Sequence, residues 1–411
     1  MHIPFLLRAV ALAAALIPLT ATAAPLSLDA ALDLAVQRSE SAHSARAGAA
    51  SASEMARASG QLPDPMLNVG VENLPVTGSD RFSTAREPMT QKVVGISQEW
   101  VSQEKRSARQ AAAQASVTRE MAQAQVAIAD TRLQTAMAYL DAYYAAEALK
   151  LTTANEHHAN EELAASRARL ASSTGGSQDV LALTAALGMS EDESAEIAQQ
   201  QSAAKVVLQR WVGAPAEDLL PVQVLLIPTE QDYVASHPLV VAAQRDIEVA
   251  RHEAAFAATN RNPNWTWSVS YGQRVGNSDM VSVGVSIPLP VSRAERQDRE
   301  TSSKLAMVEK SEAALNEATR VATSEFLALA SDTQRLQERI ERYRSAVARP
   351  AQQRTAAAMA AYRSNQATLA MLFEARHAEL EIQRKVLTLQ RDLAKTQAQL
   401  AYRPLALGAQ Q

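Results

Sequence analysis

The chain has 411 residues, with 40 Lys and Arg against 44 Asp and Glu, so its formal net charge is -4. It contains no cysteine, which excludes a disulfide framework, a thiolate zinc site, an iron–sulfur cluster and a catalytic thiol. The near-neutral charge argues against a phosphate-binding basic surface, so we expect no nucleic-acid partner. Roughly one residue in five is alanine, a composition typical of long, closely packed helices.

Residues 1–23 have the pattern of a cleavable secretory signal peptide. Arg8 supplies a positive charge, residues 9–19 are an apolar run, and residues 21–23 (Ala-Thr-Ala) suit a signal peptidase. The alternative is a single N-terminal membrane anchor, which would need about 20 apolar residues. We therefore expect export from a bacterial cytoplasm, and no lipid on an N-terminal cysteine. No later apolar run has the length of a membrane-spanning helix.

The remaining sequence follows one plan twice, with a linker (an equatorial segment) between the repeats; the three parts are residues 24–210, 211–236 and 237–411. In each repeat a helical segment stops at a proline-marked stretch, and two short strands and a long helical region follow. Residues 95–97 (Gly-Ile-Ser) match residues 284–286 (Gly-Val-Ser) at an offset of 189, and residues 178–181 match residues 367–370 at the same offset. Agreement on one offset indicates an internal duplication.

A long helix is predicted after the first pair of strands. From Gln103 to Leu170 there is neither proline nor glycine, which at about 1.5 Å per residue predicts a rod of about 100 Å. Its larger apolar residues recur at heptad spacing, as in coiled coils. Residues 172–177 break the helix, and Ser177 is suited to cap a return helix that runs to Trp211.

The second repeat is expected to build the same hairpin. Its long helical region begins near Arg293, contains Pro350 as a predicted kink, and breaks at residues 363–365 before a return helix. Each half is thus predicted to be a long antiparallel helical hairpin with a β-hairpin at its far end.

Four segments alternate apolar residues with small polar ones, and they lie at residues 67–71, 93–97, 265–271 and 281–287. This period of two predicts strands with one apolar face. A β-sandwich gives the same pattern, but four strands are too few for one. They are also too few to close a membrane barrel, which cannot leave an open edge in lipid. Several chains must share a barrel, two giving eight strands and three giving twelve.

Aromatic residues cluster at or near these strands, where a membrane-interface belt is expected; the candidates are Trp100, Trp265, Trp267 and Tyr271. The alternative is that these side chains pack ordinarily in a core or at a helix junction.

Three short segments carry a resemblance to a known family. They are residues 61–67 (Gln-Leu-Pro-Asp-Pro-Met-Leu), 73–75 (Asn-Leu-Pro) and 94–99 (Val-Gly-Ile-Ser-Gln-Glu), the last followed by Lys105 and Arg106. With the duplicated plan, they make nearly the whole chain after residue 23 resemble the TolC-like outer-membrane efflux channels, in particular the heavy-metal (CzcC/CusC-like) branch. Two features depart from that branch: Glu104 replaces its usual glycine, and the lipidated cysteine that many members carry is absent.

The resemblance implies a mainly α fold with a small β part. Duplicated long antiparallel helical hairpins would form a trimeric α-barrel, and the four β-strands of each chain would contribute to a shared 12-stranded transmembrane β-barrel in outer-membrane lipid. The homotrimer would work with a periplasmic adaptor (membrane fusion protein) and an inner-membrane RND pump, and it would conduct substrate passively to the cell exterior.

The implied cargo is heavy-metal cations such as copper, silver, zinc, cobalt or cadmium. Neither enzymatic activity nor a cofactor or resident metal is implied. A TolC-like channel for drug efflux or type I secretion has the same fold and is the first alternative. A periplasmic coiled-coil adaptor or scaffold is the second.

In this family the two helix turns form a periplasmic tip that narrows the tube and meets the adaptor. The resemblance therefore assigns adaptor docking to residues of both turns: Arg167, Arg169, Leu170, Ser173, Gly175, Gln178, Val180, Leu181, Tyr362, Arg363, Ser364, Asn365, Thr368 and Leu369. The gate candidates are Glu374, Met371 and Asp179. Glu374 is the only carboxylate at the positions of the family's acidic stretch, and three copies would favour cations. Alternatively, Glu374 is solvated surface and Met371 a packing residue.

Overall fold

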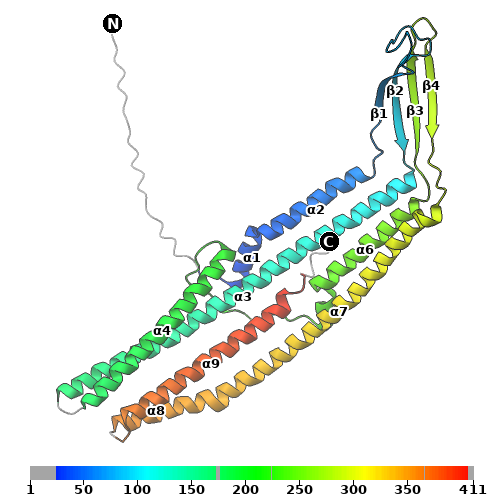
Figure 1. The fold of residues 1–411 in the computed structure, drawn as a ribbon. Coiled ribbons are helices and arrows are strands. Elements are labelled where there is room, and N and C mark those ends of the chain that lie inside the picture. Colours follow the sequence, from blue (N-terminus) through cyan, green and yellow to red (C-terminus); the bar gives the residue numbers. More distant parts are fainter. Residues whose placement is uncertain (1–24, 173–175, 224, 365, 406–411) are drawn as a thin grey trace, which may run out of the picture.

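The computed structural model describes residues 25–172, 176–223, 225–364 and 366–405. The predicted signal peptide lies outside these ranges, as do Ser173, Gly175 and Asn365. The molecule is elongated, with a β-sheet at one end and two helix turns at the other (Figure 1). No helix within the described ranges is both long and apolar enough to cross a membrane.

The first half contains α1 (Leu28–Arg38), α2 (Glu40–Ser59), β1 (Met66–Glu72), β2 (Gln91–Trp100), α3 (Gln103–Ala171) and α4 (Ser177–Val212). The 69 residues of α3 confirm the predicted rod of about 100 Å. The first helical segment is divided at Ser39, whose hydroxyl accepts a hydrogen bond from the Ala42 amide and so caps α2. The predicted Ser177 cap is wrong: Gly176 holds the cap position of α4, and no side chain of the described residues makes a capping hydrogen bond there.

The second half contains α5 (Glu230–Ala235), α6 (Pro238–Thr259), β3 (Trp265–Gln273), β4 (Met280–Ser286), a 3₁₀ turn (Arg293–Glu295), α7 (Gln297–Arg342), a π-helical segment (Tyr343–Ala348), α8 (Arg349–Arg363) and α9 (Leu369–Tyr402). The π-helical segment ends two residues before Pro350, where a kink was predicted. Proline has no amide hydrogen to donate to the carbonyl four residues earlier, and a wider helical turn accommodates its ring.

The four strands form one antiparallel sheet in the order β1-β2-β3-β4. The register places Val69 opposite Val94, Val94 opposite Tyr271, and Tyr271 opposite Val281. The predicted apolar residues of the four strands therefore share one face, except Val93, which pairs with Gly70 on the other face. The other face carries small residues: a Cβ added to Gly95 would lie 2.7 Å from that of Ser270. Within the described residues, the outer edges of β1 and β4 pair with no further strand.

The largest buried cluster lies midway along the helices, around Tyr139 of α3. The Tyr139 hydroxyl lies 2.7 Å from the carbonyl oxygens of both Leu26 and Leu220. Burial raises the pKa of this hydroxyl to about 12. The same side chain thereby holds the segment before α1 and the segment after α4 against the longest helix.

A second buried site joins the start of α6 to α7 and to the end of α9. His237 is 1% exposed, and its Nδ1 accepts a hydrogen bond from the Leu239 amide at 3.3 Å. Its Nε2 lies 3.3 Å from a carboxylate oxygen of Glu325, which also pairs with Arg403 at 3.0 Å. Tyr233 of α5 packs against the imidazole ring. Because Nδ1 accepts a hydrogen bond, the imidazole is neutral in this arrangement.

We predict that acid destabilises this junction. Burial lowers the pKa of His237 below its usual 6.5, although Glu325 opposes the shift. As the pH falls below about 6.5, His237 becomes protonated in the unfolded chain while it stays neutral in the folded chain. The free energy of unfolding therefore decreases. Urea denaturation between about pH 7.5 and about pH 5.5 should show this loss.

The matched variant is His237→Gln, whose amide can still donate to Glu325 but does not titrate. We expect it to be less stable than the wild type near neutral pH and to show a weaker pH dependence. Parallel stability profiles for the two proteins would refute a role for His237 in acid sensitivity.

Candidate functional site

The two helix turns pack against each other at the end opposite the sheet. Leu163 of α3, Leu183 of α4, and Leu369 and Leu372 of α9 form a buried cluster, against which Met359 and other partly buried residues of α8 pack. The tip of each hairpin is therefore held by the other. The structure thus brings together the two predicted docking turns, which are far apart in the sequence (Figure 1).

A polar contact connects the same two turns. The guanidinium of Arg169 on α3 lies 5.0 Å from the ring centre of Tyr362 on α8 and donates a hydrogen bond to its hydroxyl. Burial raises the pKa of Tyr362, and the nearby Arg169 opposes this shift. Both residues were predicted to dock an adaptor, and here they link the first hairpin to the second.

The three gate candidates have different surroundings. Glu374 has a side chain that is 72% exposed, and Arg354 of α8 donates to its carboxylate at 2.8 Å. Met371 is 58% exposed, and Asp179 is half-buried at the start of α4. The carboxylate that the sequence resemblance singled out as a gate residue is therefore paired with a cation from its own chain.

The other predicted tip residues divide into exposed and packed groups. The exposed group consists of Arg167, Leu170, Gln178, Leu181, Arg363 and Ser364. Val180 packs against the leucine cluster and Leu369 belongs to it. The Thr368 hydroxyl caps α9 by accepting from the Met371 amide at 3.4 Å.

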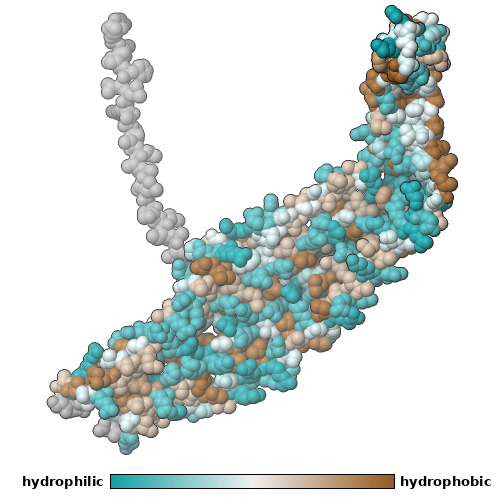
Figure 2. Space-filling view, in the orientation of Figure 1, coloured by the Kyte–Doolittle hydropathy of each residue, from teal (hydrophilic) through white to brown (hydrophobic). Residues whose placement is uncertain are grey.

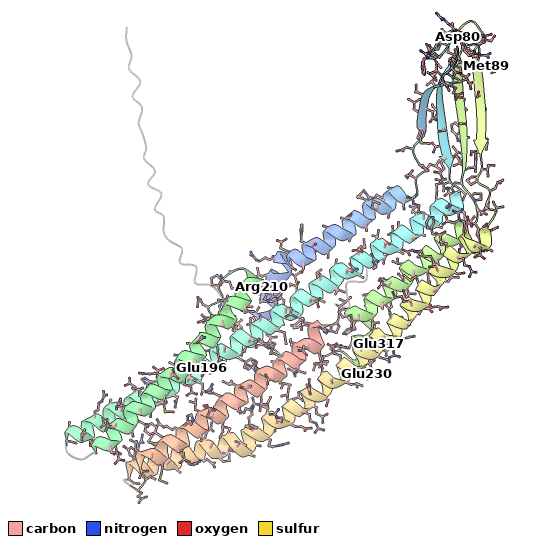
Figure 3. All side chains as sticks on the ribbon, in the orientation of Figure 1. Asp80, Met89, Glu196, Arg210, Glu230 and Glu317 are labelled. Atoms are coloured by element: carbon pink, nitrogen blue, oxygen red, sulfur yellow. The ribbon has the colours of Figure 1, made fainter. Side chains whose placement is uncertain are left out.

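A groove that the sequence did not indicate runs between α4 and α9. Its main cavity, of about 460 Å³, is lined on α4 by Asp192, Glu193 and Glu196 and on α9 by Phe373, Arg376, Glu381 and Arg384, among others. Glu196 is labelled on α4 in Figure 3. A second hollow, toward the middle of the helices, shares Arg384 and is lined also by Asp141 and Ile197.

Ion pairs made by two arginines that line this groove, Arg376 and Arg384, connect the two halves of the chain. Arg384 pairs with Glu193, and Arg376 lies 2.6 Å from Glu162. Burial raises the pKa of Glu162, with Arg376 opposing the shift. The partners lie about 200 positions apart, so no local spacing could have identified them.

The opposite end of the molecule exposes an apolar surface. On the shared apolar face of the sheet, Val69 is 76% and Val283 is 74% exposed. Figure 2 shows hydrophobic residues along the β4 side of the sheet. Asp80 and Met89, in the loop between β1 and β2, mark the far end of the sheet (Figure 3).

The predicted belt residues lie at the helix end of this sheet and along β3. The strand predicted at 93–97 extends further, so that Trp100 is the last residue of β2. It faces Trp265, with ring centres 5.9 Å apart. Trp267 and Tyr271 follow on the same face of β3. These aromatic side chains thus border the exposed apolar face.

The segments that carry the heavy-metal resemblance meet at the helix–sheet junction. The Gln98 side chain, in the Gly-Ile-Ser-Gln stretch, donates to the Pro63 carbonyl, in the Leu-Pro-Asp-Pro stretch, at 2.6 Å. Among the described residues, no group of three or more His, Asp or Glu side chains is placed to hold a metal ion.

No protein-family model matches the chain, and no curated protein matches its sequence. Solved structures are similar. The outer membrane protein VceC from Vibrio cholerae is 20% identical, with a TM-score of 0.73 over 92% of this chain and 96% of that one. The open state of the MtrE outer membrane channel from Neisseria gonorrhoeae is 17% identical, with a TM-score of 0.75 over 92% and 88%.

CusC, described for its folding and transmembrane channel formation, is 14% identical, with a TM-score of 0.75 over 91% of each chain. The TM-score for CusC equals that for MtrE, so the likeness does not single out one branch. At these identities the comparisons show a shared fold: that of outer-membrane channel chains.

Proposed function

We propose that this chain is the outer-membrane channel of a tripartite efflux system and conducts substrate passively to the cell exterior. The observation that carries the proposal is the apolar face of the sheet, which is exposed across all four strands at one end of a largely helical rod. Water does not favour such a face, whereas the hydrocarbon of a membrane does. The fold shared with solved outer-membrane channels supports the same conclusion.

The unpaired edges of β1 and β4 support assembly with further copies. Backbone groups at an open edge cannot stay unpaired in lipid, so β4 of one chain would pair with β1 of the next. Three chains of four strands would close a barrel of twelve. The helical hairpins would then surround the axis as a tube across the periplasm. Both halves of the chain repeat the same element order, in keeping with a duplicated chain divided near residues 211–236.

The helix turns and the groove between α4 and α9 are the proposed docking surface for a periplasmic adaptor, which would connect the channel to an RND pump. Exposed tip residues such as Leu181, which is 71% exposed, are available to a helical partner. The groove adds carboxylates and guanidiniums from both hairpins. An adaptor that binds there would contact both hairpins at once and could change their separation.

Heavy-metal cations are the proposed cargo, on the strength of the Leu-Pro-Asp-Pro and Gly-Ile-Ser-Gln segments. These segments contact each other at the helix–sheet junction and form no ligand set, so they support kinship with that branch rather than selection of an ion. Drug efflux and type I secretion remain the alternative cargoes for the same channel.

Two experiments test the function. The purified chain should migrate as a detergent-resistant trimer and produce single-channel currents in a planar bilayer. A protein that fractionates with soluble periplasmic contents and forms no trimer would instead be an adaptor or scaffold. A deletion strain should become sensitive to copper, silver, zinc, cobalt or cadmium; sensitivity to drugs alone would assign the channel to the alternative cargo class.

The Glu374–Arg354 pair yields a prediction about ion selectivity. Because the pair carries no net charge, replacing either residue by a neutral one should leave the charge of its partner unneutralised at the tip. We expect Glu374→Gln to shift the reversal potential toward anion preference and Arg354→Gln to shift it toward cation preference. Unchanged reversal potentials in both variants would place the pair away from the aperture.

A further inference from the structure

The segment that joins β4 to the next helices exposes apolar side chains outside any strand. Ile287, Leu289 and Val291 are 56%, 81% and 96% exposed. They continue the alternation of Val281, Val283 and Val285 beyond the last strand residue, Ser286. Three exposed aliphatic side chains at alternate positions favour an apolar environment that the described residues of this chain do not supply.

The backbone of this segment is poorly suited to pair with a neighbouring strand. Pro288 and Pro290 have no amide hydrogen to donate to a β-ladder. The Val291 amide instead donates to the Leu289 carbonyl at 2.9 Å, which bends the chain. A second copy that extended the sheet at the β4 edge would therefore find its ladder ending here, so strand pairing would not extend over the segment.

Two arginines without a paired carboxylate among the described residues come after this segment in the sequence. Arg293 and Arg296 are exposed, and neither has a carboxylate within 4.0 Å among the residues that the structure describes. Nearby guanidiniums differ in this respect: Arg261 lies 2.9 Å from Asp298, and Arg299 lies 3.7 Å from Glu295. A free guanidinium presents a planar set of donors that matches two oxygens of a phosphate.

Trp100 and Trp265 show where residues 287–296 lie relative to the membrane–water interface of the proposed barrel. Thr266 is paired with Ser286, so Trp265 is level with Ile287. Indole rings favour the membrane–water interface. From the strand outward, the order is therefore the valines of β4, then the tryptophan pair and Ile287 at the interface, then Leu289 and Val291, and last the arginines. This matches the order of acyl chain, glycerol region and phosphate in a leaflet.

We propose that residues 287–296 form a binding site for anionic phospholipids of the leaflet next to the helices, with Leu289 and Val291 against the glycerol region and the adjoining ends of the acyl chains, and Arg293 and Arg296 on the headgroup phosphates. The site rests on the proposed function, since it requires that the sheet spans a membrane.

The binding test uses dioctanoyl phosphatidylglycerol against dioctanoyl phosphatidylcholine, added to the purified trimer and counted as bound lipid by native mass spectrometry. The wild type should prefer phosphatidylglycerol, and Arg293→Gln/Arg296→Gln should weaken its binding by about 30-fold. The matched control, Arg261→Gln/Arg299→Gln, removes two paired cations from the same end and should change the binding much less. Equal binding of the two lipids by the wild type, or an unchanged preference in the first double variant, would overturn the site.

A second measurement identifies what covers the apolar residues. Because the chain has no cysteine, Leu289→Cys and Val283→Cys can each carry a single bimane label in vesicles of brominated phosphatidylglycerol and phosphatidylcholine. We expect bromine to quench both labels. Quenching at Val283→Cys alone would mean that a neighbouring subunit covers the segment, which refutes this inference and leaves the channel intact. Quenching at neither position would refute the channel itself.

Discussion

Val283→Lys should abolish insertion of the trimer into membranes. Val283 is 74% exposed on the apolar face of β4, where the proposed barrel meets lipid. A lysine at the middle of a lipid-facing strand costs about 2–4 kcal/mol, and a trimer carries that cost three times. The fraction of chain recovered as detergent-resistant trimer from outer membranes should therefore fall to near zero, while circular dichroism of the expressed chain should still show its helices.

The neighbouring residue provides the control. Ser282 is also exposed but lies on the small-residue face, which would look into the water-filled lumen. We expect Ser282→Lys to insert with near-normal yield and to alter only the conductance. If both variants insert equally well, the apolar face does not contact lipid, and the channel proposal loses its main support.

Leu372→Ala should loosen the tip. Leu372 is fully buried in the leucine cluster that joins the two helix turns, and truncation of a buried leucine to alanine costs about 2–5 kcal/mol. The loss falls on a contact between hairpins, so the turn between α8 and α9 should separate from α3 and α4. Amide hydrogen exchange at residues 360–372 should accelerate by about 30-fold or more, and the closed-state conductance should rise.

Met371 is adjacent in the chain but 58% exposed, which makes Met371→Ala a matched control for loss of an apolar side chain at the same helix end. We expect little change in exchange or conductance. Equal acceleration in both variants, or none in Leu372→Ala, would mean that the leucine cluster does not hold the turns together.

The strands and long helices could be predicted because their patterns are local. Alternation along β3 and β4 marked one apolar face, and the absence of proline and glycine from 103 to 170 marked a single rod. Local chemistry was less decisive at helix ends. Ser177 has a capping side chain, yet Gly176 precedes it and takes the extended backbone of the cap position. Propensity alone could not choose between them.

Contacts between the halves could not be predicted in the same way. The pairing of Arg384 with Glu193 and the hydrogen bond from Arg169 to Tyr362 each depend on how two hairpins lie side by side. Glu374 shows the same limit: its sequence position suggested an isolated carboxylate, and only the fold places Arg354 beside it. Candidate tip residues could thus be located by segment, whereas their partners required the arrangement of the helices.

The small-residue face of the sheet has a consequence for permeation. Between Glu72 near one end and Glu99 near the other, this face bears only uncharged side chains, and its middle consists of Val93 and of the small or polar residues Asn68, Gly70, Gly95, Ser97, Ser268, Ser270, Gly272, Ser282 and Gly284. In the proposed trimer this face would line the lumen, and its uncharged side chains would offer a passing ion no charged group to bind. Solutes would cross that part of the path by simple diffusion, and discrimination among them would depend on the opposite end of the molecule.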